Sequence, residues 1–337
     1  MKRLLSLSCL LAMVLFCNSC ITEEQYENTP EGNFNALWKI LDEHYCFFDY
    51  KQVNWDSIYT VYHKSLTPDM TAKNQFEVFS KMLDELKDGH VNLYAAHDVG
   101  RYWGWREDHP ANYRADIVEK YLGTDDEYAI AAGLKYKALD DNIGYIRYES
   151  FSDPIGDGNI SEVLNSLAAC NGLIIDIRDN PGGALTNATR LAGHFTNDKI
   201  LAGYMSHKTG PGHHDFSQPE AVYLEPSSGV RWQKKAIVLT NRGCFSAAND
   251  FVKAIKECAG VTVVGDSTGG GSGFPFSSEL PNGWSVRFSA SPLYDAAMHY
   301  TEFGIAPDIN VEMKEEDLEK GKDTLIEFAR ALLKQTN

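Results

Sequence analysis

Short apolar runs alternate with helical patterns through the second half of this 337-residue chain. Short runs of aliphatic and β-branched residues indicate buried strands, whereas apolar residues repeated every three or four positions indicate helices. Strands that alternate with helices form crossover units, so this stretch is expected to fold as an α/β core. The strands are expected at 143–148, 173–177, 236–239 and 261–264, and the helices at 160–169, 184–195 and 247–258.

A single serine stands at the junction between one of these strands and the helix that follows. Ser246 comes shortly after the apolar run 236–239 and just before the helical pattern that begins at 247. The unpaired N–H groups at a helix N-terminus can stabilise an oxyanion, and a tight turn can hold the hydroxyl outward. Such a position suits a catalytic nucleophile. It also suits an ordinary N-cap, whose hydroxyl accepts a hydrogen bond from the helix backbone.

Glycine-rich turns follow two of the other strands. The turn 176–183 ends in Gly182 and Gly183, and the loop 265–273 is also rich in glycine. Glycines at such turns let the backbone approach a ligand closely and aim its N–H groups inward. Three charged residues of the first turn are expected to brace it rather than to act in catalysis: Asp176, Arg178 and Asp179.

Six motifs of this chain, spread over about residues 75–312, occur in the order found in one peptidase family. They are Leu86 to Val91, Ile143 to Ile146, Asp176 to Gly183, the segment around Ser246, Gly265 to Gly273, and Glu302 to Asp308. The chain therefore resembles the C-terminal-processing and tricorn-type serine peptidases, the tail-specific protease superfamily. The resemblance implies a crotonase/ClpP-like α/β catalytic core, serine-type peptidase activity and Ser246 as the nucleophile.

One absence places the chain in the tricorn-like branch. In the C-terminal-processing branch a lysine of the glycine-rich loop is the general base, but Gly271 stands at that position here, and no lysine lies between Lys256 and Lys314. In the tricorn branch a histidine far upstream is the base, and a glutamate near the end of the catalytic domain assists it. The matching residues here are His90 and Glu302. Neutral imidazole, whose ordinary pKa is about 6.5, can take a proton from serine near neutral pH.

Each of these assisting roles has a simpler alternative. His90 follows a helical pattern over 74–87, and histidine is ordinary at a helix end. Glu302 is expected either to orient the imidazole or to complete a proton relay through another polar group, and its alternative is an exposed loop carboxylate. The resemblance also implies a backbone oxyanion hole, made by the N–H of Ala247 and that of Gly182 or Gly183.

No metal or other cofactor is expected. His213, His214 and Asp215 lie in a polar loop without the spacing of a zinc site, so a solvated loop is the simpler interpretation. Cys244, two residues before Ser246, offers an alternative thiol nucleophile, but the resemblance favours the serine. The irregular cysteine spacing favours buried thiols over a disulfide framework.

The N-terminus has the pattern of an export signal. Lys2 and Arg3 precede a largely apolar stretch, Leu4 to Phe16, which is short for a membrane span. The pair Ser19-Cys20 resembles the cleavage site of bacterial lipoproteins, although Cys17 and Asn18 depart from the usual residues there. Residues 1–19 are therefore predicted to be a signal peptide and Cys20 a lipidated residue, with ordinary signal cleavage nearby as the alternative. These features predict an exported protein that is anchored by lipid to a bacterial membrane and lies in the periplasm or on the cell surface.

The amino-acid composition and net charge limit the kinds of molecule that this chain can bind. The chain is 43% hydrophobic, which permits a large core, and its formal charge is −16, which makes nucleic acid an unsuitable partner. A polypeptide substrate is expected instead. The predicted function is a serine peptidase that hydrolyses exported polypeptides. The alternative is a catalytically silent module on the same fold that binds a ligand or a peptide.

The order of these features predicts the domain organisation. A tether (20–32) leads to a small N-terminal helical domain (33–95) that delivers His90, and a connecting segment (96–141) follows that is too short for a complete PDZ domain. The catalytic domain occupies 142–337 and ends in an amphipathic helix over 315–335, which Gly321 could interrupt.

Overall fold

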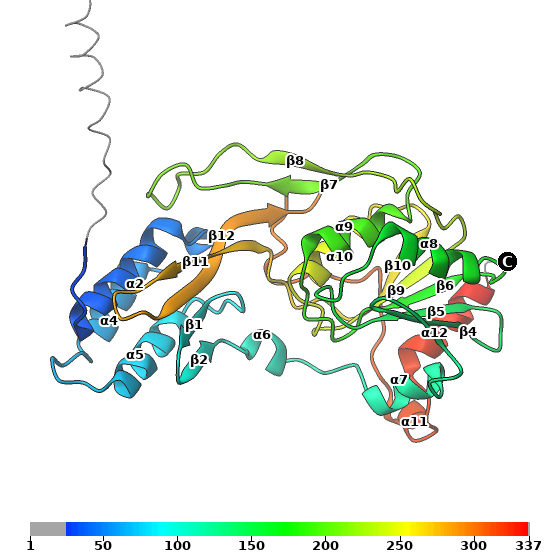
Figure 1. Cartoon of the computed structure of the whole chain (residues 1–337), viewed down its shortest axis with the longest axis horizontal. Coiled ribbons are helices and arrows are strands. Elements are labelled where there is room, and N and C mark those ends of the chain that lie inside the picture. Colours follow the sequence, from blue (N-terminus) through cyan, green and yellow to red (C-terminus); the bar gives the residue numbers. More distant parts are fainter. Residues whose placement is uncertain (1–24, 336–337) are drawn as a thin grey trace, which may run out of the picture.

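A seven-stranded sheet lies toward one end of the molecule, and part of a second, six-stranded sheet lies with the N-terminal helices toward the other end (Figure 1). The computed structural model describes residues 25–335. The predicted signal peptide and Cys20 lie outside the described residues. Within residues 25–335, no helix combines the length and the hydrophobicity that crossing a bilayer requires.

The α/β core is built on a seven-stranded sheet. Its strands are β3 (Ala129–Ala131), β4 (Leu134–Ala138), β5 (Gly144–Tyr148), β6 (Leu173–Asp176), β9 (Ala236–Thr240), β10 (Val261–Gly265) and β13 (Ile309–Asn310). Their order in the sheet is β13-β10-β9-β6-β5-β4-β3. The strands from β13 to β5 run parallel, and β4 and β3 add an antiparallel edge. The predicted α/β class is confirmed, and the four strands expected from the apolar runs are present as β5, β6, β9 and β10.

Helices bury both faces of this sheet, because successive residues of a strand point to opposite sides. In β6, Leu173 and Ile175 belong to the core on one face and Ile174 to the core on the other. The first face is covered by α8 (Asp157–Ser166), α9 (Leu185–Gly193) and α10 (Ala247–Ile255), and the second by α7 (Ala115–Leu122) and α12 (Thr324–Lys334). The amphipathic segment 315–335 forms α11 (Glu315–Leu318) and then α12, with Gly321 between them at φ +68°.

The N-terminal part is helical as expected, but its helices pack on a second sheet. The helices are α2 (Pro30–His44), α3 (Phe48–Lys51), α4 (Trp55–His63) and α5 (Ala72–Asp84). The strands are β1 (Asn92–Ala95), β2 (Asp98–Arg101), β7 (Ile200–Met205), β8 (Glu220–Leu224), β11 (Gly273–Glu279) and β12 (Ser285–Tyr294). They are ordered β2-β1-β12-β7-β8, and β11 pairs with β12. Apolar residues of β1 and β12, such as Leu93 and Phe288, complete the core beneath α2 and α5.

Long-range strand pairing therefore ties the two parts together. β12 lies far along the chain, yet it pairs with β1 of the N-terminal part and, at its other end, with β7. The segment 96–141 is also more than a connection, since it holds β2, α6 (Gly104–Glu107), α7, β3 and β4. These contacts place the end of α5, the glycine-rich loop before β11 and the start of α10 around one site.

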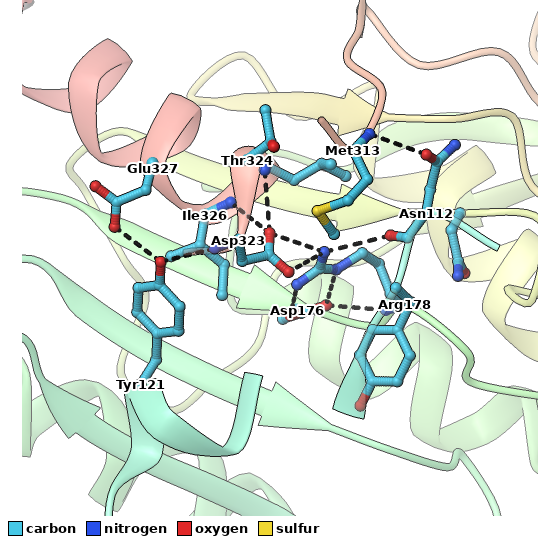
Figure 2. Close-up of polar contacts among 12 residues, drawn as sticks. Asn112, Tyr121, Asp176, Arg178, Met313, Asp323, Thr324, Ile326 and Glu327 are labelled. Carbon is cyan, nitrogen blue, oxygen red and sulfur yellow. Dashed lines mark hydrogen bonds and ion pairs between the residues drawn. The ribbon is translucent and has the colours of Figure 1, made fainter. Parts of the chain in front are cut away.

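Buried charges brace the turn that follows β6 (Figure 2). The Arg178 guanidinium donates to Asp176 Oδ2 at 2.6 Å and to Asp323 Oδ2 at 2.9 Å, and all three side chains are fully buried. Asp323 also caps α12, because its carboxylate accepts the N–H groups of Leu325 and Ile326. The buried Arg147 lies 3.5 Å from Asp176 Oδ1 and balances the charge of the cluster. The C-terminal helix is thereby fastened to the strand that leads into the 176–183 turn.

Candidate active site

Ser246 occupies a strained turn at the start of α10. Its backbone has φ +57° and ψ −120°, a combination that residues with a side chain rarely adopt. Two backbone bonds hold the turn: Phe245 N–H donates to the Asn180 carbonyl at 3.0 Å, and Ser246 N–H donates to the Gly270 carbonyl at 2.9 Å. Ser246 stands at the N-cap position, but its hydroxyl makes no capping bond. The hydroxyl is therefore turned away from the helix it precedes.

The Ser246 hydroxyl faces His90. Ser246 Oγ lies 2.9 Å from His90 Nε2, although 156 residues separate the two in the sequence. His90 is positioned between α5 and β1, where its backbone N–H donates to Asp88 Oδ1 at 2.8 Å. The Phe245 ring packs against the imidazole with its centroid 4.9 Å away. The histidine is thus held by its backbone and by its ring.

Burial keeps the imidazole neutral. His90 is 4% exposed, and burial lowers its pKa to about 4, against the opposing charge of Asp88 and with the help of Arg287 and Lys51. A neutral ring at pH 7 has one nitrogen free to accept a proton. With Nε2 facing a serine hydroxyl, this pair has the geometry and protonation state of a nucleophile and its general base.

Within residues 25–335, neither the other ring nitrogen of His90 nor the Ser272 hydroxyl forms a hydrogen bond of ordinary geometry. His90 Nδ1 is buried and forms no hydrogen bond of ordinary geometry within the described chain. The Gly273 backbone is nevertheless close enough to His90 to favour the protonated ring, and so it partly opposes the fall in the His90 pKa. The Ser272 hydroxyl is likewise buried without a partner among these residues. Buried polar atoms are normally hydrogen-bonded, and both residues border the same cavity.

Glu302 is a buried carboxylate near His90 and Ser246, and it is not the exposed loop residue of the alternative interpretation. It is 4% exposed, and burial together with Asp88 raises its pKa to about 7, while Lys51 opposes the rise. Oε2 accepts the Ser272 N–H at 2.9 Å, and Oε1 accepts Lys51 Nζ at 2.8 Å. Within residues 25–335 its carboxylate makes no direct hydrogen bond to His90. Glu302 thus contacts the backbone of Ser272, whose hydroxyl has no partner in the part of the chain that the structure describes.

Lys51 is a residue that sequence reasoning missed. Its Nζ lies between two carboxylates, 2.8 Å from Glu302 Oε1 and 3.3 Å from Asp88 Oδ2, and its side chain is only 4% exposed. Asp88 also accepts hydrogen bonds from the hydroxyls of Tyr45 and Ser289. Asp88 stands in the motif Leu86 to Val91, two residues before His90, and could have been singled out. No local pattern marks Lys51, which belongs to the four-residue helix α3.

The backbone around Ser246 offers two N–H groups. Gly182 N–H already donates to Asn180 Oδ1 at 2.9 Å, whereas no acceptor within the described chain takes the N–H of Gly183 or Ala247. Gly182 has φ +94°, and a methyl group there would lie 2.8 Å from the Ser246 Cβ. Only glycine allows the turn to pass so close to the serine.

Two cavities meet at the serine and histidine. One, of about 410 Å³, is bordered by the start of α9, the start of α10 and the loop into β11, and the other, of about 330 Å³, by β1, β2 and aromatic residues of the 102–105 segment. Four residues border both cavities: His90, Gly183, Ser246 and Arg287. An extended chain lying in both would pass directly over the Ser246 hydroxyl.

Other candidate residues are engaged elsewhere. Cys244 is fully buried, its thiol donates to the Ile177 carbonyl at 3.0 Å, and burial raises its pKa to about 12, so it offers no thiolate. His213 pairs with Asp42 and His214 with Asp49, each at 2.8 Å. Asp179 pairs with Arg106.

Two parts of the chain match known families. Residues 142–311 match peptidase family S41, and residues 26–84 match the tricorn protease C1 domain. The chain belongs to peptidase family S41. The predicted recognition of the tail-specific protease family is thereby confirmed.

The chain is also similar to individual proteins in sequence or in fold. A crystal structure of a candidate peptidase from Parabacteroides merdae has 51% identity and a TM-score of 0.87, and the match covers 91% of this chain and 97% of that one. The carboxy-terminal processing protease CtpA of Bacillus subtilis is 27% identical over 177 residues, which are 52% of this chain and 36% of that protein. Mature CPAF in complex with lactacystin shares the fold, with a TM-score of 0.68 at 12% identity over 91% of this chain and 98% of that one.

Proposed function

We propose that this S41 protein is a serine peptidase that hydrolyses peptide bonds, with Ser246 as the nucleophile and His90 as the general base. The observation that carries the proposal is the 2.9 Å contact between a strained turn serine and a buried imidazole with a pKa of about 4. A serine hydroxyl becomes an effective nucleophile only when a neighbouring base accepts its proton. The carboxy-terminal processing proteases named among its relatives are consistent with a polypeptide substrate.

The reaction begins when His90 Nε2 accepts the proton of the Ser246 hydroxyl while Oγ attacks the peptide carbonyl carbon. The N–H groups of Gly183 and Ala247 stabilise the oxyanion that forms, since no acceptor within residues 25–335 takes either of them. Gly183 borders the same cavity as Ser246, and Ala247 follows Ser246 in the chain. The imidazolium then gives its proton to the departing amine, and the acyl-enzyme remains. Water, activated by the same imidazole, hydrolyses the acyl-enzyme and restores the serine.

Ser272 links His90 to Glu302 in this proposal. When Nε2 accepts the serine proton, Nδ1 carries a hydrogen and requires a buried acceptor. The Ser272 hydroxyl, which has no partner within residues 25–335, borders the same cavity as His90 and is the acceptor proposed here alongside the Gly273 backbone. The Ser272 N–H donates to the Glu302 carboxylate. The negative charge of Glu302 then stabilises the imidazolium through Ser272 without touching the ring. Lys51 and Asp88 position this carboxylate.

A serine-directed phosphonate distinguishes the peptidase from a catalytically silent binding module. The proposed enzyme reacts covalently at Ser246, and intact-mass analysis of the labelled protein followed by peptide mapping locates the adduct. His90→Ala is expected to slow labelling strongly, since the base is lost. Labelling at another residue, or none in a folded protein, would favour the silent module.

Export and lipid anchoring complete the proposed function. The apolar stretch Leu4 to Phe16 and the pair Ser19-Cys20 support removal of residues 1–19 and lipidation of Cys20. The mature enzyme would then act on exported polypeptides at a bacterial membrane, on its periplasmic or cell-surface side.

A further inference from the structure

We infer that Arg287, assisted by Arg101, binds a carboxylate of the polypeptide substrate beside the scissile bond. The inference rests on the proposed peptidase function and specifies which substrates that site prefers.

The two arginines lie in one row across three strands. In the register of the second sheet, Arg101 of β2 is paired with Asn92 of β1, and Asn92 is paired with Arg287 of β12. Residues directly opposite on antiparallel neighbours project from the same face of a sheet. All three border the 330 Å³ cavity, so this face looks into the site. Asn92 Nδ2 donates to the Gly89 carbonyl at 3.2 Å, which ties the row to the segment that carries His90.

Arg287 is placed where it can reach substrate on either side of the serine. It borders both cavities together with His90, Gly183 and Ser246, and its charge is near enough to lower the pKa of His90. Arg101 borders only the second cavity, where its guanidinium lies 5.8 Å from the centre of the Tyr94 ring. Arg287 is therefore the principal residue of the pair and Arg101 an outer one.

Within residues 25–335, Arg101 and Arg287 take part in no ion pair, although the whole chain has 47 acidic and 31 basic residues. Among the described residues that line the two cavities, one is acidic, Asp250. Its carboxylate already pairs with Lys253 Nζ at 2.5 Å. Guanidinium groups bind carboxylates through paired, charge-assisted hydrogen bonds. The unsatisfied charge at the site therefore favours an anionic group on the substrate.

Two substrate groups carry this chemistry: an aspartate or glutamate side chain, and the free carboxylate of a C-terminus. The rest of the lining favours apolar neighbours for that group. Leu185, Phe274 and Leu293 border the first cavity, and Trp103 and Trp105 the second. The preferred substrate is thus a largely apolar segment with one carboxylate close to the cleaved bond.

A peptide series tests the inference and separates the two sources. Internally quenched peptides of one apolar sequence carry glutamate, glutamine or lysine at successive positions, each with a free or an amidated C-terminus, and mass spectrometry locates the cut. We expect kcat/KM to be at least about tenfold higher for the best carboxylate peptide than for its neutral counterpart. Preference that persists in amidated peptides identifies a side chain, whereas preference that requires the free end identifies the C-terminus.

Variants assign the preference to the arginines. Arg287→Gln should bring the glutamate-to-glutamine ratio close to one, Arg287→Lys should keep part of it, and Arg287→Glu should favour lysine peptides. Arg101→Gln should lower the ratio less. Arg231→Gln, an exposed arginine that borders neither cavity, is the control and should leave the ratio unchanged. A wild-type ratio of one, or a ratio that Arg287→Gln and Arg101→Gln both leave intact, would overturn the inference.

Peptide binding keeps this test independent of catalysis. Fluorescence anisotropy with Ser246→Ala protein should give the same carboxylate preference in Kd. Phosphonate labelling of Ser246 without any carboxylate preference would overturn the inference alone. Carboxylate-selective binding without labelling or cleavage would overturn the peptidase function and retain the anion site.

Discussion

Lys51 Nζ lies 2.8 Å from Glu302 Oε1, although 251 residues separate these two side chains in the sequence. Lys51 belongs to α3 in the N-terminal part, and Glu302 follows β12 beside the glycine-rich loop. Their side chains are 4% and 3% exposed, so water screens neither charge. The fully buried Asp88 carboxylate lies 3.3 Å from the same Lys51 ammonium, which therefore forms ion pairs with two carboxylates. The ion pair therefore fastens the segment before His90 to the loop that carries Ser272.

Lys51→Met is expected to destabilise the protein by about 3 kcal/mol, because two buried carboxylates lose their counter-ion. Urea unfolding followed by circular dichroism measures the loss. Lys199→Met, which removes an exposed lysine paired with Glu225, is the control and should cause no measurable change. Equal midpoints for both variants would mean that water reaches the Lys51 cluster.

Ser246→Gly and Ser246→Ala should both abolish peptide hydrolysis but differ in stability. Alanine keeps the strain at φ +57°, whereas glycine adopts this conformation freely, so the glycine variant should be more stable by about 1 kcal/mol. Urea unfolding and a peptide cleavage assay give both quantities. Ser152→Ala, another serine of the cavity wall, should retain activity. Residual hydrolysis by Ser246→Ala would disprove the nucleophile.

The pH profile of kcat/KM should contain two acid limbs. Burial lowers the pKa of His90 to about 4, so the base becomes protonated only at the acid end of the range. Burial beside Asp88 raises the pKa of Glu302 to about 7, so its negative charge, and with it the activity, increases as pH rises through 7. The positive charge of Lys51 lowers the pKa of Glu302 and so opposes the effect of burial. The positive charge of Arg287 adds to the effect of burial and lowers the pKa of His90 further.

Glu302→Gln should remove the limb near pH 7, keep the lower one and reduce turnover by more than about tenfold, or roughly 1.4 kcal/mol of barrier. Asp308→Asn is the control, because it removes another carboxylate of the same segment, one that pairs with Lys256. This variant should change neither limb of the pH profile. Persistence of the upper limb in Glu302→Gln would assign it to another group.

Ser272→Ala tests the link between His90 and Glu302. Loss of the hydroxyl leaves Nδ1 without its proposed acceptor, so kcat should fall by about tenfold or more while KM changes little. Steady-state kinetics across the neutral range measures both constants. Ser267→Ala, in the same loop but outside both cavities, should be close to wild type. A Ser272→Ala enzyme with unchanged kcat would rule out the link.

Cys20→Ala tests the anchor. If Cys20 carries lipid, the variant should move from the membrane fraction to the soluble fraction, because several acyl chains hold a protein firmly and their absence releases it. Immunoblots of fractionated cells measure the distribution. Cys17→Ala, in the same segment, should remain with the membranes. Identical fractionation of Cys20→Ala and wild type would argue for a different anchor.

Local sequence patterns were sufficient for the α/β core. Apolar runs marked β5, β6, β9 and β10 nearly to the residue, because burial on both faces makes most residues of these strands apolar. The same patterns placed Ser246 at the start of a helix, and Gly182 and Gly183 at the turn beside it. Each of these features depends on residues that are neighbours in the chain. The sequence therefore determined four of the seven strands of this sheet and the position of the serine at the start of α10.

Tertiary structure alone decided how distant segments complete the site. Lys51 carries no local signal, and its burial between Asp88 and Glu302 arises only when α3 packs against the loop after β12. The row of Arg101, Asn92 and Arg287 likewise depends on the register of three strands, which the sequence of any one strand does not determine. Gly182 and Gly183 differ only in the folded structure, where Asn180 Oδ1 accepts the N–H of Gly182 and no acceptor within residues 25–335 takes that of Gly183. Packing and strand register are collective properties of the folded chain, and they assembled the charges around a serine that the sequence had already positioned.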